Sequence, residues 1–88
     1  MRRNRFERVD EVQEDAITLE LAPDGDMEQA RVHVPGADGV PARTSGAAKK
    51  VDAFRNAIKI ANTMKLAIVV MGDEGAWDSE WGDLYTPV

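Results

Sequence analysis

Residues 66–71 read LAIVVM, the longest apolar run in this chain of 88 residues. Its β-branched residues favour a strand, and apolar side chains stand at both odd and even positions, so both faces of that strand must be buried. Ile68 and Val70 point to one side of it, whereas Val69 and Met71 point to the other. The rest of the chain must therefore cover this strand twice, and the architecture depends on which segments supply the two covers.

Residues 16–34 have the pattern of a β-hairpin. Asp24 and Gly25 form a favoured two-residue turn, because both tolerate the positive φ that a type I′ turn requires. A turn at this position places Leu19 opposite Ala30 on an apolar face. The polar residues fall on the other face: Thr18, Glu20, Arg31 and His33. The hairpin is therefore expected to turn one face to the core and the other to water.

Residues 35–45 are rich in glycine and proline and are expected to form a loop before a helix over residues 46–65. Thr44 or Ser45 can cap the N-terminus of that helix. Apolar side chains recur along it at spacings of three and four, in two adjacent stripes: Val51, Phe54, Ile58 and Ala61, then Ala53, Ala57, Ile60 and Met64. Such a helix covers one face of a small sheet, so the second cover must come from elsewhere.

We expect the second cover from residues 72–88, an acidic tail that holds both tryptophans. Trp77, Trp81 and Tyr85 are four residues apart, which aligns them on a helix, and all three positions are odd, which also aligns them on a strand. Because Gly75 and Gly82 interrupt a long helix, we predict a short turn near Trp77 and a fourth strand over residues 83–86. The rings either close the domain's own core or anchor a partner, and both roles can coexist.

Residues 1–15 are predicted to form a basic arm or a short helix, since Asn4 and Glu7 have the spacing of a capping box. The remaining residues, 16–88, are predicted to form a single domain. Its predicted class is α+β, with a small, mainly antiparallel sheet of ββαβ(β) topology and one long helix packed on one face.

Composition limits the class of protein further. A domain of this length buries only about 60–65% of the surface that its unfolded chain exposes, and without cysteine it has neither a disulfide nor a thiolate metal ligand. No apolar run approaches the roughly 20 residues of a membrane span, and no signal peptide is evident, so we expect a soluble, cytoplasmic protein. The net charge of −5 argues against general binding to nucleic acid or to anionic membranes.

The sequence offers little support for catalysis or metal binding. His33, the only histidine, could act as a general base beside Asp15 or Glu20, but no serine or cysteine nucleophile is evident near it. The carboxylates of the tail lack the spacing of a calcium loop. The segment before the helix lacks the pattern of a phosphate loop and leaves only a weak anion contact, at residues 44–46. We therefore predict no enzyme activity, no cofactor and no metal site.

The leading functional hypothesis is a small protein-binding module, an accessory or inhibitory subunit that acts through the tail. Tryptophan and tyrosine often anchor interfaces, and surrounding carboxylates steer towards a basic partner or imitate nucleic acid. The predicted contact residues are Trp77, Asp78, Glu80, Trp81, Asp83 and Tyr85. The surplus of apolar surface also suggests a homodimer.

The alternative is a nucleic-acid-binding accessory protein. Its basic residues would grip phosphates from the helix and the preceding loop: Arg43, Lys49, Lys50, Arg55 and Lys59, assisted by Arg2, Arg3 and Arg5 of the N-terminal arm. The excess of 16 acidic over 11 basic residues weighs against this alternative.

Overall fold

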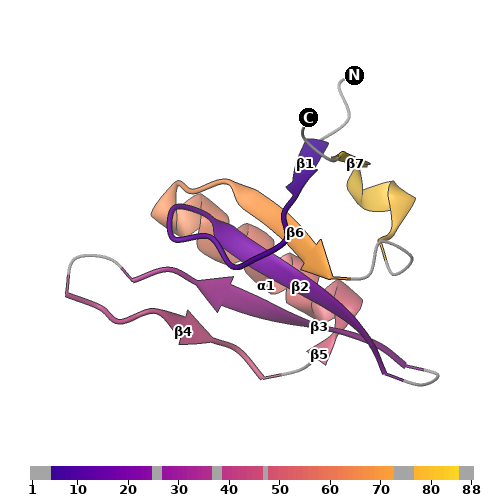
Figure 1. Ribbon diagram of the computed structural model, residues 1–88, viewed down its shortest axis with the longest axis horizontal. Coiled ribbons are helices and arrows are strands. Elements are labelled where there is room, and N and C mark those ends of the chain that lie inside the picture. Colours follow the sequence, from indigo (N-terminus) through magenta and orange to yellow (C-terminus); the bar gives the residue numbers. More distant parts are fainter. Residues whose placement is uncertain (1–4, 25–26, 37–38, 47, 73–76, 86–88) are drawn as a thin grey trace.

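The computed structural model describes residues 5–24, 27–36, 39–46, 48–72 and 77–85. Within these ranges one α-helix, α1 (Lys50–Met64), packs against a mixed sheet, and a short 3-10 helix, η2 (Ser79–Trp81), precedes the last strand (Figure 1). The strands are β1 (Arg5–Arg8), β2 (Ile17–Asp24), β3 (Met27–Val34), β4 (Arg43–Thr44), β5 (Ala48–Lys49), β6 (Ile68–Gly72) and β7 (Asp83–Tyr85). The α+β class predicted from the sequence is confirmed.

The sheet order is β4-β3-β2-β6-β1-β7, with β5 also paired to β3. β6 runs parallel to both β2 and β1, and β7 runs parallel to β1, whereas β3 is antiparallel to its neighbours. The sheet is therefore mixed, and the prediction of a mainly antiparallel one is wrong. The predicted ββαβ(β) topology is not confirmed either, since β1 precedes the hairpin and lies inside the sheet.

The N-terminal segment differs most from expectation. Arg5–Arg8 forms a strand between β6 and β7, where a helix or an arm was predicted. The Phe6 side chain is only 6% exposed, and the Val9 amide donates to the Val70 carbonyl at 2.8 Å. The prediction failed because four residues carry little local signal, and the partners that stabilise this strand lie more than 60 residues away in sequence.

The hairpin is confirmed, with its register shifted by two residues. Leu19 pairs with Val32, and the last described pair is Asp24 with Met27, so the connecting residues are 25 and 26, which lie outside the described ones. The polar face was expected to lie in water, but Thr18 on that face is fully buried. A shift of two residues keeps the side chains of residues 17–21 and 29–34 on their predicted faces, because the side-chain period of a strand is two. It also places Leu21 opposite Ala30, which completes the apolar face.

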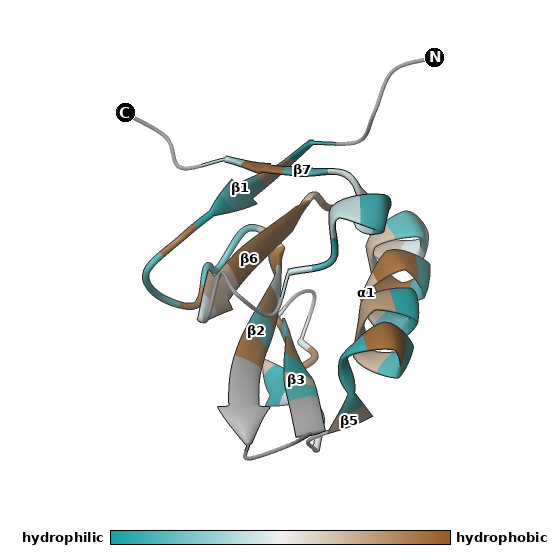
Figure 2. Cartoon of the chain, turned by 90° about the vertical axis from the view of Figure 1, so that its right-hand side faces the viewer, coloured by the Kyte–Doolittle hydropathy of each residue, from teal (hydrophilic) through white to brown (hydrophobic). Residues whose placement is uncertain are grey.

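β6 is an inner strand, flanked by β2 and β1 (Figures 1 and 2). Figure 2 shows α1 on one side of the sheet and the connection between β1 and β2 on the other, with the hydrophobic β6 between them. Val70 lies in the core on the helix side, and Val69, pointing to the opposite side, is also buried. Both faces of β6 are thus covered, as the pattern of residues 66–71 predicted.

The helix meets the sheet through small side chains at a spacing of four, Ala53, Ala57 and Ala61, all of which are buried. Their small size lets the helix approach the apolar face of β2 and β3 closely. That face consists of Ile17, Leu19, Leu21, Ala30, Val32 and Val34. α1 ends at Met64, and its C-cap, Lys65, has a left-handed φ of 58°. This turn lets the Leu66 N–H donate to the Ala61 carbonyl at 3.0 Å, beside the Lys65 N–H.

The helix begins later than predicted. Ala48 and Lys49 form β5 by pairing with Ala30 and Gln29, so α1 starts at Lys50. The predicted cap at Thr44 or Ser45 is therefore wrong, and Lys49 occupies the N-cap without a side-chain hydrogen bond. Ser45 instead bridges to the sheet, where its Oγ accepts from the Val32 N–H at 2.9 Å.

The described part of the aromatic tail, residues 77–85, does not supply the second cover. Trp77 and Trp81 pack on the helix side, against Phe54 of α1, while the far face of β6 lies under residues 9–16, the connection from β1 to β2. The Gln13 N–H donates to Thr18 Oγ1 at 3.1 Å, which ties this connection to the sheet beneath it. The cover predicted from the C-terminus is thus supplied by the N-terminal segment.

Candidate binding surfaces

Phe54 and the two tryptophans form an aromatic cluster beside η2. The Phe54 and Trp81 rings are stacked, with centroids 4.3 Å apart and planes 6° from parallel. Trp77 meets Trp81 edge-on at 5.1 Å and Phe6 at 5.2 Å, and its indole N–H donates to the Gly82 carbonyl at 3.2 Å. Gly82 has a φ of 137°, which a residue with a side chain rarely adopts.

The cluster reaches the surface. Phe6 is buried beneath it, whereas Phe54, Trp77 and Trp81 are each only half-buried. Asp78 accepts a hydrogen bond from the Glu80 N–H at 2.9 Å and so caps η2, and the Glu80 side chain is exposed beside it. We call the set of Phe54, Trp77, Asp78, Glu80 and Trp81 the η2 surface: a half-exposed aromatic patch bordered by two carboxylates.

Two of the predicted contact residues do not belong to the η2 surface. Asp83 and Tyr85 alternate along β7 with Leu84, which packs against the helix-side core, so both point to the far face. Tyr85 is 38% exposed, and the Arg5 guanidinium lies over its ring at 4.6 Å. The fold therefore groups four of the six predicted residues, adds Phe54, and separates the other two.

The basic residues predicted as one anion contact are distributed over several places. Arg43 and Lys59 line the same pocket, of about 360 Å³, between β4 and α1. The Lys50 ammonium lies 6.0 Å from the centre of the Trp81 ring, Lys49 belongs to β5, and Arg55 is exposed on α1. Residues 44–46 do not lead directly into the helix as predicted, because β5 intervenes and α1 begins at Lys50.

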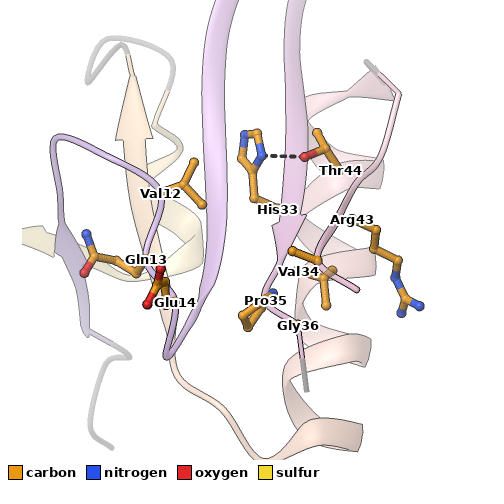
Figure 3. A pocket seen from close by; sticks show the side chains of 10 residues that line it. Val12, Gln13, Glu14, His33, Val34, Pro35, Gly36, Arg43 and Thr44 are labelled. Atoms are coloured by element: carbon orange, nitrogen blue, oxygen red, sulfur yellow. Dashed lines mark hydrogen bonds between the residues drawn. The ribbon is translucent and has the colours of Figure 1, made fainter. Parts of the chain in front are cut away.

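A larger pocket, of about 510 Å³, lies on the far face of the sheet (Figure 3). The connection between β1 and β2 supplies one wall of it, through Val12 and Glu14, and the end of β3 together with β4 supplies the other, through His33 and Thr44. His33 is held on both sides: its Nε2 lies 2.8 Å from Glu20 Oε1, and its Nδ1 lies 2.9 Å from Thr44 Oγ1.

A carboxylate, an imidazole and a hydroxyl in series are also the parts of a nucleophilic triad. Acyl transfer, however, needs backbone donors for the oxyanion beside the nucleophile. The amide that follows Thr44, that of Ser45, already donates to the Val32 carbonyl at 2.9 Å. We therefore interpret Glu20, His33 and Thr44 as a polar network that joins three neighbouring strands, β2, β3 and β4. The sequence predicted that Glu20 could lie near His33. It did not indicate Thr44, because Thr44 reaches His33 only through the pairing of β4 with β3.

Among the described residues, no group of three or more histidine, aspartate or glutamate side chains is arranged to hold a metal ion. The one α-helix in the described part of the chain is too short and too polar to cross a membrane. No protein-family model matches this chain, and neither does any curated protein or solved structure.

Proposed function

We infer that this protein is a small protein-binding module that contacts a basic partner through the η2 surface. The observation that carries the proposal is the half-exposure of three aromatic rings at one place on the surface, beside the carboxylates of Asp78 and Glu80. Aromatic anchors of this kind provide most of the binding energy in many interfaces, because they bury a large area with few rotatable bonds.

The rings are already fixed in place before any partner arrives. Trp81 is stacked on Phe54, Trp77 is held by its hydrogen bond to Gly82, and Asp78 fixes the turn between them. A preformed patch loses little side-chain entropy on binding, which favours affinity. The carboxylates of Asp78 and Glu80 add electrostatic attraction to a positively charged partner and raise the rate of encounter.

The test is affinity capture from the native host with the full chain and three variants, followed by titration of the purified partner. Trp81→Ala should weaken that binding about 30-fold, the effect expected of a central aromatic anchor. Glu80→Lys should reduce the association rate and its dependence on salt. Tyr85→Ala is the matched control, because it removes an exposed aromatic ring from the opposite face.

A partner that binds all three variants as tightly as the unmodified chain would refute the proposal. Thermal unfolding of each variant separates a lost contact from a lost fold. Sedimentation equilibrium tests whether the partner is a second copy of this chain. In that case Trp81→Ala should convert a dimer to a monomer, and Tyr85→Ala should leave the dimer intact.

A further inference from the structure

A second candidate site lies between the C-terminal half of α1 and the chain segment that leads into β4. It consists of two pockets, of about 190 Å³ and about 360 Å³, which share Arg43 and Met64 as lining residues. Neither lining includes any residue of the η2 surface, so this groove is independent of the function proposed above.

One end of the groove is apolar. Apart from Arg43, the described residues that line the smaller pocket are all apolar: Val34, Pro35, Val40, Pro41 and Met64. Val40 is 55% exposed, so its side chain is accessible to a ligand in this pocket. This end of the groove can take a short aliphatic chain.

The other end is cationic. Arg43 from β4 and Lys59 from α1 line the larger pocket together with the polar side chains of Asn56 and Thr63. The Thr63 hydroxyl donates to the Lys59 carbonyl, so its oxygen can still accept a hydrogen bond. No carboxylate occurs among the described residues that line either pocket, in a chain with 16 acidic residues. Two positive charges without an acidic neighbour in the lining favour an anion there.

We propose that this groove binds a small amphiphilic anion, in which a carboxylate or phosphate group lies between Arg43 and Lys59 and a short aliphatic chain occupies the pocket next to Val40 and Met64. A small-molecule site commonly combines an apolar wall with a few convergent polar groups, as this one does. Each methylene group buried against that wall adds up to about a four-fold gain in affinity.

Calorimetric titration of the full chain with octanoate tests the charge and the chain separately. Octanoate should bind with a dissociation constant below about 1 mM. Octanol lacks the charge and acetate lacks the chain, so each should bind at least about ten-fold more weakly. Amide chemical shifts should change on addition of octanoate at Val40, Lys59 and Thr63, and stay constant at Trp81.

Matched double variants test the residues. Arg43→Gln with Lys59→Gln should weaken octanoate binding at least ten-fold, whereas Arg31→Gln with Arg55→Gln should leave it unchanged. The control removes the same charge from two exposed positions that line neither pocket. Val40→Ser, at an exposed position, should weaken octanoate binding without affecting acetate binding.

The proposal is overturned if octanoate gives no heat and no shift change up to about 10 mM, if octanol binds as tightly as octanoate, or if both double variants behave alike. Phosphatidylglycerol vesicles distinguish a free ligand from a membrane lipid. Co-sedimentation of the chain with these vesicles, lost only in Arg43→Gln with Lys59→Gln, would overturn the assignment to a free small molecule.

Discussion

Leu19 and Thr18 are neighbours on β2, and both are fully buried, but they point into opposite environments. Leu19 faces α1 and belongs to an aliphatic core. Thr18 faces the connection between β1 and β2 and accepts a hydrogen bond from the Gln13 amide. One face of the sheet is therefore held by apolar contact with a helix, and the other by polar contact with an irregular segment that has few apolar side chains.

The difference indicates where each kind of function can lie. On the far face the polar groups of Glu20, His33 and Thr44 satisfy one another, so they contribute to the fold and leave little free chemistry. On the helix side the aliphatic core continues into aromatic rings that stay half-exposed at η2. Apolar surface beyond what the fold buries is available for a partner.

The largest effect is expected from deletion of residues 1–15, which removes β1 and the cover of the far face together. Loss of the buried Phe6 side chain alone should cost about 3–5 kcal/mol, comparable to the whole stability of a small domain. We expect circular dichroism to show no cooperative unfolding transition for residues 16–88. A sharp transition close to that of the full chain would mean that the far face needs no cover.

The next largest effect on stability is expected from a substitution in the aliphatic core. Leu19→Ala should lower the free energy of unfolding by about 2–5 kcal/mol, since it leaves a cavity at a fully buried site between the sheet and α1. Urea denaturation measures this change. A loss below about 1 kcal/mol would show that the helix side packs loosely.

The corresponding change on the far face is Thr18→Val, which keeps the shape of the side chain and removes its hydroxyl. The Gln13 amide loses its partner but lies near the surface, so the expected loss is about 1 kcal/mol, smaller than for Leu19→Ala. Amide exchange should become faster at Gln13 and stay unchanged at Ala57. Unchanged exchange at Gln13 would show that this hydrogen bond does not hold the connection.

The smallest effect concerns the network around His33. His33→Ala should cost about 0.5–1 kcal/mol, because Glu20 and Thr44 can both reach water once the imidazole is gone. A double-mutant cycle with Thr44→Ala should give a coupling energy of a few tenths of a kcal/mol. A coupling energy of zero would leave this hydrogen bond without a stabilising role.

The periodic parts of the fold could be predicted from sequence. Alternation along the hairpin assigned the side chains of residues 17–21 and 29–34 to their faces even though the register was shifted by two. The apolar residues 66–71 required an inner strand. The start of α1 could not be predicted, because Ala48 and Lys49 are good helix formers that pair with β3 instead. At these two residues the pairing with β3 overrides the local helix propensity.

The binding surfaces were only partly predictable, for the same reason. The tail contains the aromatic residues of the η2 surface, but Phe54 joins them from α1, and the alternation along β7 turns Tyr85 away. Arg43 and Lys59 share a pocket because β4 returns to β3 beside the helix. Contacts between distant segments decide both groupings, and no local pattern indicates them.

The N-terminal segment serves both as an inner strand and as the cover of the far face of β6. Residue-resolved amide hydrogen exchange tests it without altering the chain, by comparing the Val9 amide, which donates to Val70, with the Ile17 amide, which donates to Ala67. We predict protection of Val9 within about ten-fold of that of Ile17, since both bonds attach strands to β6. Exchange of Val9 at the rate of an unstructured peptide, with Ile17 protected, would show that the N-terminal segment is not a stable part of the sheet.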